Sequence, residues 1–159
     1  MCGIVAAAAG SNIVSDLIEG LKKLEYRGYD SAGLALLAAG GIERVRAVGR
    51  VAELQTAASG CSAHTGIAHT RWATHGAPAE HNAHPHVSGS IAVVHNGIIE
   101  NFRELREALE KKGTVFKTET DTEIVLHLVD DMLKGGVKPV EAVRATLSQL
   151  RGAFALGFI

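Results

Sequence analysis

The chain has 159 residues, of which 47% are hydrophobic and 21% charged, and its formal net charge is -1, which fits one globular domain that can bury a core. Basic residues are mixed with acidic ones and apolar stretches stay short of the ~20 residues of a membrane span, so neither nucleic-acid nor membrane binding is expected. The start has no basic and apolar signal sequence, so we expect a cytoplasmic location in which both cysteines, Cys2 and Cys61, stay reduced.

The N-terminal part of the chain predicts several strands and one helix. In chain order the pattern indicates a strand at residues 3–9, a helix at 15–26, a loop at 27–33 and strands at 33–38 and 43–48. An irregular connector at 52–65 and a fourth strand at 66–70 follow. Ser15 can cap the helix, because a serine hydroxyl at this position accepts a backbone N–H. The alternation in 43–48 predicts a strand that forms a hairpin with its predecessor across Gly40 and Gly41.

The C-terminal part predicts three helices between two strands. The first strand is expected at residues 90–97 and the last at 153–159. The three helices between them are expected at 101–113, at 120–133 and from 139 onward. Asn101 and Glu104 suggest a capping box, and Pro139 suits the first position of a helix. Strands with hairpin-like spacing and helices in pairs predict an α+β layered fold with a mostly antiparallel sheet. The last strand runs to the final residue, so we expect the natural domain to continue.

Cys2 follows the initiator methionine directly. Removal of Met1 would place a thiol and a free α-amine on one residue, and that amine, with a reference pKa of about 8, can accept the thiol proton at neutral pH. A free cysteine is mostly protonated at pH 7, so such a base decides whether it reacts. The position predicts an N-terminal nucleophile. The alternative is a small residue that begins a buried strand.

Two polar segments follow predicted strands. In HTRWATHG, the planar guanidinium of Arg71 suits a substrate carboxylate; the alternative is that Arg71 forms a structural ion pair while Trp72 packs in the core. In VVHNGIIEN, the Asn96 amide and the Gly97 backbone N–H could converge on one developing oxyanion. The alternative for Asn96 and Gly97 is an ordinary hairpin turn, for which Asn-Gly is a strong signal.

The segment TETDTE precedes a predicted helix and carries three acids with period two. Asp121 at its centre could bind an ammonium group in a pocket. The alternative is structural, because acids and threonines at a helix N-terminus cap the helix and interact favourably with its dipole.

Histidines are dense in the middle of the chain. Six lie within 23 residues: His64, His69, His75, His81, His84 and His86. A zinc site remains an alternative, but no cysteine pair joins the histidines and HPH lacks the helical spacing of zincin ligands. We therefore expect no metal ligands and no cofactor.

Six motifs, taken together and in order, resemble the glutaminase domain of the glutamine:fructose-6-phosphate amidotransferases (isomerizing), the glucosamine-6-phosphate synthases. They are MCGIV, LEYRGYDSAG, HTRWATHG, NAHPH, HNGIIEN and TETDTE. Other class II amidotransferases share an N-terminal cysteine and an Asn-Gly pair, whereas YRGYDSAG, HTRWATHG and HNGIIEN resemble this member. The resemblance covers residues 1–159 and implies an N-terminal-nucleophile hydrolase fold, a four-layer αββα sandwich, here the N-terminal part of an amidotransferase domain that is expected to be truncated.

The resemblance also implies roles for the matching residues. Cys2 would be the nucleophile, with its own amine as the base after loss of Met1. Asn96 and the Gly97 amide would form the oxyanion hole, and Arg27 would organise the surroundings of the nucleophile without reacting.

A second set of matching residues would bind the substrate. These are Arg71, Trp72, Thr74, His75, Gly76 and Asp121. By the resemblance, Arg71 would bind the α-carboxylate of glutamine with help from Thr74 and His75, and Asp121 would bind the α-ammonium group. Trp72 and Gly76 would belong to a loop that closes over glutamine, with the indole gating the passage of ammonia.

The implied activity is hydrolysis of L-glutamine to glutamate and ammonia, the glutaminase half-reaction of glutamine–fructose-6-phosphate transaminase (isomerizing). The implied partners are the sugar-isomerase domains, which would bind fructose 6-phosphate in a homodimer and are absent from this chain. Two departures from the family are Ala6, where glycine is usual, and the short length of the chain. An inactive glutamine-binding or regulatory module and a histidine-rich metal protein are the alternatives.

Overall fold

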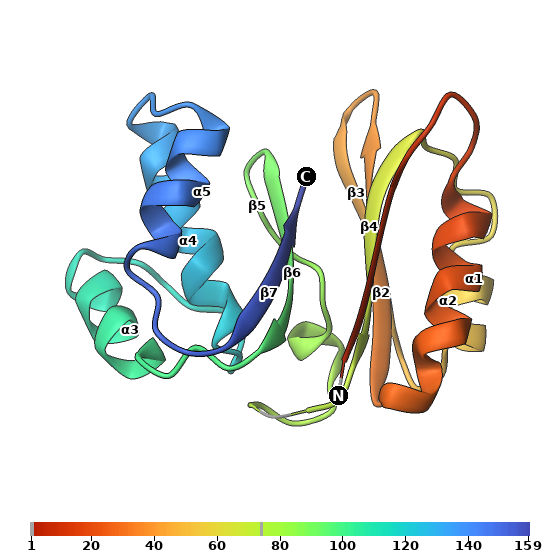
Figure 1. Ribbon diagram of the computed structural model, residues 1–159, viewed down its shortest axis with the longest axis horizontal. Coiled ribbons are helices and arrows are strands. Elements are labelled where there is room, and N and C mark those ends of the chain that lie inside the picture. Colours follow the sequence, from red (N-terminus) through yellow and green to blue (C-terminus); the bar gives the residue numbers. More distant parts are fainter. Residues whose placement is uncertain (1, 74) are drawn as a thin grey trace.

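The computed structural model describes residues 2–73 and 75–159 and has four layers, with two sheets face to face and helices outside each (Figure 1). The strands are β1 Gly3–Ala8, β2 Ser31–Ala38, β3 Gly41–Val48, β4 Thr65–Arg71, β5 His86–Ser88, β6 Ile91–Gly97 and β7 Phe154–Phe158. The α-helices are α1 Val14–Leu24, α2 Val51–Ala57, α3 Phe102–Lys111, α4 Thr122–Lys134 and α5 Pro139–Leu147, with short 3₁₀ turns η1 Glu25–Arg27 and η2 Glu80–Asn82.

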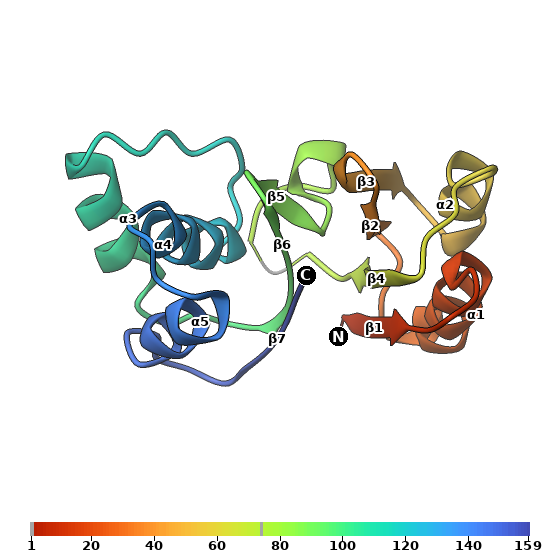
Figure 2. The ribbon, with the colours of Figure 1, turned by 90° about the horizontal axis from the view of Figure 1, so that it is seen from above.

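Each sheet belongs to one half of the chain. The first sheet has the order β1-β4-β2-β3 and the second β5-β6-β7, and every pair of strands in the described residues is antiparallel. Helices α1 and α2 cover the outer face of the first sheet, and α3, α4 and α5 lie beyond the second (Figure 2). This confirms the α+β class and the αββα sandwich. No helix in the described ranges has the length and apolar content needed to span a membrane.

Three apolar layers hold the sandwich together. The first packs α1 and α2 against one sheet and includes Leu17, Leu21 and Leu54, which are fully buried. The second packs α4 and α5 against the other sheet. A thinner layer between the two sheets contains Ile67 on β4 and Val94 on β6. The layer between the sheets matters most for the site, because side chains there face the opposite sheet.

Strand alternation decides which polar side chains reach the space between the sheets. Successive side chains of a strand point to opposite faces, so residues two apart share one face. Ile67 on β4 belongs to the layer between the sheets, which places His69 and Arg71 on the same face. Likewise, Val94 on β6 belongs to the layer between the sheets, which places Asn96 on the face of β6 toward the first sheet. The polar ends of two apolar strands therefore face each other.

Several local predictions were wrong. Ser15 does not cap α1; the helix begins at Val14, whose N–H is bound by the side chain of Asn12 at 3.2 Å. Residues 27–33 are only partly a loop, because β2 begins at Ser31. The expected connector 52–65 contains most of helix α2.

The capping box predicted at Asn101 was also wrong. Asn101 precedes α3, but its amide donates to the carbonyl of Gln149 at 2.9 Å and accepts the N–H of Arg151 at 2.9 Å. The side chain thus joins α3 to the segment before β7 rather than capping its own helix. The predicted hairpin at Gly40 and the helix start at Pro139 are confirmed.

Candidate active site

Cys2 lies immediately before β1, which is an edge strand of the first sheet. The backbone N–H of Trp72 donates to its sulfur at 3.2 Å. Its carbonyl accepts the side-chain N–H of Asn96 from the other sheet at 3.1 Å. Burial raises the pKa of the Cys2 thiol, and the N–H of Trp72 partly opposes this by stabilising the thiolate. A half-buried thiol with a raised pKa needs a nearby base to react at neutral pH.

Asn96 and Gly97 end strand β6 opposite Cys2. They are part of the strand pair with β7, so the interpretation as a two-residue hairpin turn is wrong. Gly97 has φ +114°, and a Cβ there would lie 2.1 Å from the carbonyl oxygen of Ala153. Only glycine fits this backbone. The Asn96 amide is held on its other side by His69, whose Nε2 lies 2.9 Å from Oδ1.

Arg71 ends β4, and its side chain is only 3% exposed. It donates to the backbone carbonyls of His75, Gly76 and Ala77, at 2.9 Å to Gly76 and 3.1 Å to Ala77. The carboxylate of Asp30 lies 3.6 Å from Nη1. Three of its five N–H groups therefore hold the following loop in place. The structural ion pair weighed above is present.

Asp30 is a site residue that sequence reasoning did not single out. Its carboxylate accepts the backbone N–H of Ala73 and the hydroxyl of Ser31, the latter at 2.8 Å. With the ion pair to Arg71, these bonds fix the chain on both sides of Trp72, whose N–H binds the Cys2 sulfur. Its position in the YRGYDSAG motif was the available signal.

Asp121 lies immediately before α4 and is 4% exposed. Its side chain does not cap the helix; it accepts the N–H of Ile99 at 2.9 Å, and its other oxygen lies 3.7 Å from Nδ1 of His95. The same His95 nitrogen lies 2.9 Å from the hydroxyl of Thr122. The interpretation of Asp121 as a cap is therefore wrong, and the carboxylate is anchored at the edge of a cavity.

A small cavity joins these residues. It has a volume of about 20 Å³, which is room for one water molecule. Its lining comes from both sheets and from the start of α4: Cys2, Arg71, Trp72, His75, His84, His95, Gly97, Thr120, Asp121 and Thr122. Most of the predicted site residues thus meet in one place, but the space is far too small for an amino acid.

The other predicted site residues lie around this cavity. Trp72 is 54% exposed, so its interpretation as a core residue is wrong. The His75 ring packs edge-on against Phe102 with centroids 4.9 Å apart. Gly76 has φ +79° and no room for a Cβ beside Asn82. Arg27 ends η1 and does not line the cavity.

One predicted substrate-binding residue, Thr74, lies outside the described residues. Besides Asp30, sequence reasoning missed the site roles of other polar residues, among them His69, His95 and Thr122. His69 and His95 carry a signal, because each lies two residues before the end of an apolar strand. Thr122 carries none, since threonine is ordinary at a helix start.

The histidine cluster is not arranged as a metal site. Within residues 2–73 and 75–159, no group of three His, Cys, Asp or Glu side chains could hold a metal ion. The nitrogens Nε2 of His84 and Nε2 of His86 lie 2.8 and 2.9 Å from the hydroxyls of Thr122 and Thr120. These two ring nitrogens are thus engaged by hydroxyl groups.

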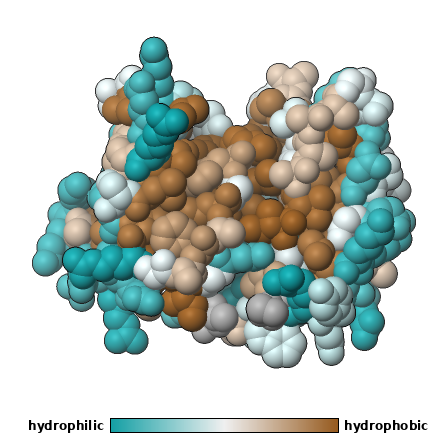
Figure 3. Space-filling model, in the orientation of Figure 1, coloured by the Kyte–Doolittle hydropathy of each residue, from teal (hydrophilic) through white to brown (hydrophobic). Residues whose placement is uncertain are grey.

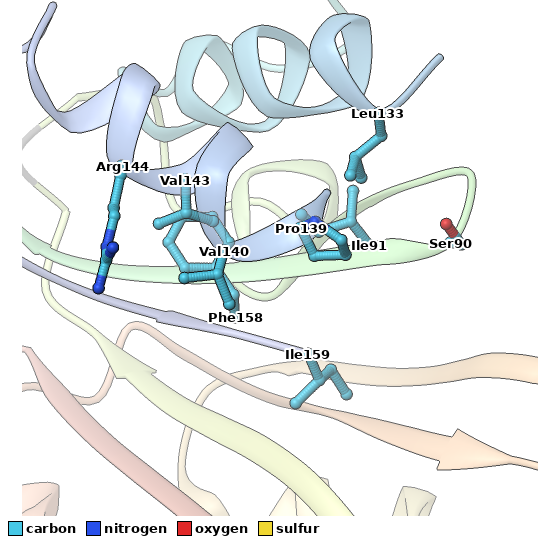
Figure 4. Close-up of a pocket in the computed structure, with 9 residues that line it drawn as sticks. All are labelled: Ser90, Ile91, Leu133, Pro139, Val140, Val143, Arg144, Phe158 and Ile159. Carbon is cyan, nitrogen blue, oxygen red and sulfur yellow. The ribbon is translucent and has the colours of Figure 1, made fainter. Parts of the chain in front are cut away.

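A much larger hollow lies elsewhere. It has a volume of about 800 Å³ and lies between α5 and the strands β6 and β7. Its lining is mainly aliphatic, with Val140 and Val143 from the helix facing Phe158, as Figure 4 shows. Apolar side chains also gather across the middle of this face of the molecule (Figure 3). The hollow contains none of the polar groups described above, so size alone does not mark the site.

An αββα sandwich with a thiol at the start of β1, facing an Asn-Gly pair on the second sheet, has the arrangement expected of an amide-cleaving N-terminal-nucleophile protein. A family model described as "Glutamine amidotransferase domain" matches residues 69–159. The chain belongs to this glutamine amidotransferase family.

Full-length relatives resemble the chain closely. The glutamine–fructose-6-phosphate aminotransferase (isomerizing) of Bradyrhizobium diazoefficiens is 62% identical, and that of Acinetobacter baylyi 57%, over all of this chain and 26% of each relative. The chain therefore spans about a quarter of the length of these curated relatives. Among solved structures, glutamine phosphoribosylpyrophosphate amidotransferase from B. subtilis is 25% identical with a TM-score of 0.87, covering 100% of this chain and 35% of that one. The fold predicted from the sequence, that of the N-terminal-nucleophile hydrolases, is confirmed.

Proposed function

We propose that the chain hydrolyses L-glutamine to glutamate and ammonia with Cys2 as the nucleophile. After loss of Met1, the α-amine of Cys2 takes the thiol proton, and the sulfur bonds to the side-chain amide carbon of glutamine. The C–N bond then breaks, ammonia leaves with the proton from the amine, and water hydrolyses the γ-glutamyl thioester. The observation that carries this proposal is the meeting of Cys2, Arg71, Gly97 and Asp121 at one cavity.

Asn96 and Gly97 are proposed to stabilise the oxyanion of the tetrahedral intermediate. An amide nitrogen carries two hydrogens, and the bond to the carbonyl of Cys2 uses one of them. The second hydrogen and the Gly97 N–H are neutral donors of the kind that bind a developing oxyanion. The bond to Cys2 keeps the amide beside the attacking residue.

Arg71 and Asp121 are proposed to bind the two charged groups at the α-carbon of glutamine, which selects glutamine over amides that lack these charges. The cavity of about 20 Å³ must enlarge before glutamine can enter. Arg71 would then exchange loop carbonyls, such as that of Gly76, for the α-carboxylate. Thr74 and His75 would assist from the same loop, and Trp72 would gate the passage of ammonia.

The wider role follows from the relatives. We propose that this chain is the ammonia-supplying part of an enzyme that makes glucosamine 6-phosphate from fructose 6-phosphate, as expected for relatives named glutamine–fructose-6-phosphate aminotransferase. Sugar-isomerase domains would receive the ammonia in a homodimer, and Arg27 would support the surroundings of Cys2. Residues 1–159 would form the N-terminal part of the amidotransferase domain, in the cytoplasm.

A glutaminase assay with two cysteine variants tests the proposal. Cys2→Ala should reduce glutamate release to background, whereas Cys61→Ala should leave it nearly intact, because Cys61 lies on the far side of the first sheet and contacts Glu43 at 3.2 Å. Equal losses in the two variants would contradict a Cys2 nucleophile. Labelling with a glutamine-like electrophile, followed by peptide mapping, should modify Cys2 alone.

The closed cavity and the raised thiol pKa favour one competing function, an inactive glutamine-binding module. Intact-mass measurement separates the two functions. A species lighter by one methionine carries the free amine that the hydrolysis needs. Full retention of Met1, with glutamine binding but no turnover, would support the module instead.

A further inference from the structure

Four buried histidines lie beside the site: His69, His84, His86 and His95. The ring centroids of His69 and His84 are 4.3 Å apart, and those of His84 and His86 are 4.7 Å apart. Burial lowers the pKa of His69 to about 4 and that of His86 to about 3, so both rings are neutral at neutral pH. His84, His86 and His95 interact with threonine hydroxyls, whereas His69 interacts with the Asn96 amide.

The hydrogen-bond partners determine the tautomer of His69. Its Nε2 lies 2.9 Å from the backbone carbonyl oxygen of His95 and 2.9 Å from the side-chain oxygen of Asn96. A carbonyl oxygen can only accept, so Nε2 must carry the hydrogen. A neutral ring has one N–H, which leaves Nδ1 without a hydrogen.

The same reasoning determines which way the Asn96 amide faces. A side-chain amide has an oxygen that accepts and a nitrogen that donates, and only its partners distinguish the two ends. The His69 N–H requires an acceptor on one side, and the carbonyl of Cys2 requires a donor on the other, 3.1 Å away. Both ends of the amide are therefore specified, one by β4 and one by the residue before β1.

We propose that His69 is a positioning residue that holds the Asn96 amide with its nitrogen toward Cys2, so that an N–H is available to the oxyanion. The proposal rests on the proposed glutamine hydrolysis. His69 touches no reacting atom, and it acts only through Asn96. Without its N–H, the amide can rotate by half a turn and present an oxygen to the Cys2 carbonyl and the oxyanion, where two acceptors repel.

Three variants test this role. His69→Leu should lower kcat for glutamine about 100-fold, the typical effect of losing one oxyanion donor, with KM nearly unchanged. His69→Gln should regain most of that loss, because the glutamine amide nitrogen can occupy the place of Nε2 and donate. The matched control is His86→Leu, which removes an equally buried ring of the same cluster that bonds Thr120 and does not line the cavity. This control should retain kcat.

The outcomes that would overturn the role are equally specific. Equal kcat losses in His69→Leu and His86→Leu, or a folded His69→Gln no better than His69→Leu, would show that the ring only fills space. Should a variant not fold, the ¹⁵N spectrum of the unaltered protein still decides: protonation of His69 at Nε2 supports the role, and protonation at Nδ1 contradicts it. Failure of the proposed function is distinguishable, because the unaltered protein would then neither release glutamate nor be labelled at Cys2.

Discussion

The two halves of the molecule contribute to the site in different ways. The N-terminal half, β1 to β4 with α1 and α2, presents a thiol and a loop whose backbone N–H and carbonyl groups are organised by Asp30 and Arg71. The C-terminal half, β5 to β7 with α3 to α5, presents buried or half-buried side chains such as Asn96 and Asp121, each held by defined partners. If the chain hydrolyses glutamine as proposed, charge stabilisation is preorganised in the C-terminal half, while the segment after β4 has to move for glutamine to enter.

The largest expected effect comes from the C-terminal half. Asn96→Ala should lower kcat for glutamine by about 10²–10³-fold, because it removes an oxyanion donor and the bond to the Cys2 carbonyl. Steady-state kinetics measure this, with thermal unfolding as the control for folding. A KM increase with unchanged kcat would instead place Asn96 in substrate binding. It would contradict the assignment of charge stabilisation to the C-terminal half.

A somewhat smaller effect on stability is expected at Gly97. Gly97→Ala should lower the free energy of unfolding by about 3 kcal/mol, because its φ is +114° and the new methyl group would meet the backbone of Ala153 and Phe154. Urea unfolding measures the loss. Gly10→Ala is the matched control, because a methyl group there meets nothing within 4 Å. Similar losses of unfolding free energy in both variants would contradict a specific requirement for glycine at position 97.

The N-terminal half is tested by Asp30. Asp30→Asn should raise KM for glutamine and reduce kcat/KM by about 30-fold, since a charged acceptor of the Ala73 N–H and the ion pair to Arg71 are lost; this corresponds to about 2 kcal/mol. Kinetics at several glutamine concentrations separate KM from kcat. A pure kcat effect, with KM unaltered, would mean that the loop is as preorganised as the opposite half.

The smallest effect concerns acid stability of the C-terminal half. Burial disfavours the charged form of Glu123, but hydrogen bonds from His127, Lys117 and Thr118 outweigh it and lower the carboxyl pKa to about 2. A carboxyl pKa lowered by folding stabilises the protein above its unfolded value of 4.5, and this stabilisation is lost as pH falls toward 2. Between pH 5 and 2, the melting temperature of the unaltered protein should fall more steeply than that of Glu123→Gln. Parallel curves would contradict this linkage.

The fold could be predicted where one face of an element is strongly apolar. Leu17 and Leu21 on α1 repeat with the helical period, and residues 91–94 on β6 form a continuous apolar run; both elements were placed to within a few residues. Helix α2 has only seven residues and β5 only three, too few to establish a period, and both were missed. The two predicted caps failed for different reasons: α1 begins at Val14, before Ser15, with its first N–H bound by Asn12, and Asn101 binds Gln149 and Arg151 from a distant segment.

The site could be predicted in composition but not in geometry. The motifs and the family resemblance identified many of the residues that line the cavity, including Cys2, Arg71 and Asp121, but not His95 or Thr122. The contacts of Asp30 with Ala73 and of His69 with Asn96 join residues 43 and 27 positions apart. The first contact depends on the pairing of β2 with β4 and the second on how the two sheets meet, and no local pattern encodes either. Sequence reasoning for this reason missed the residues that act through others.

Hydrogen bonds join the two sheets at the site: the Asn96 side chain on β6 donates to the backbone of Cys2 ahead of β1, and His69 on β4 donates to Asn96 and to the His95 carbonyl. The association of the two sheets and the binding of a ligand in the cavity are therefore thermodynamically linked. A compound that fills the space and bridges Arg71 to Asp121 should protect the whole sandwich against heat, by about 2.7 kcal/mol at a hundredfold excess over its Kd. Melting temperature thus offers a ligand screen that requires no turnover.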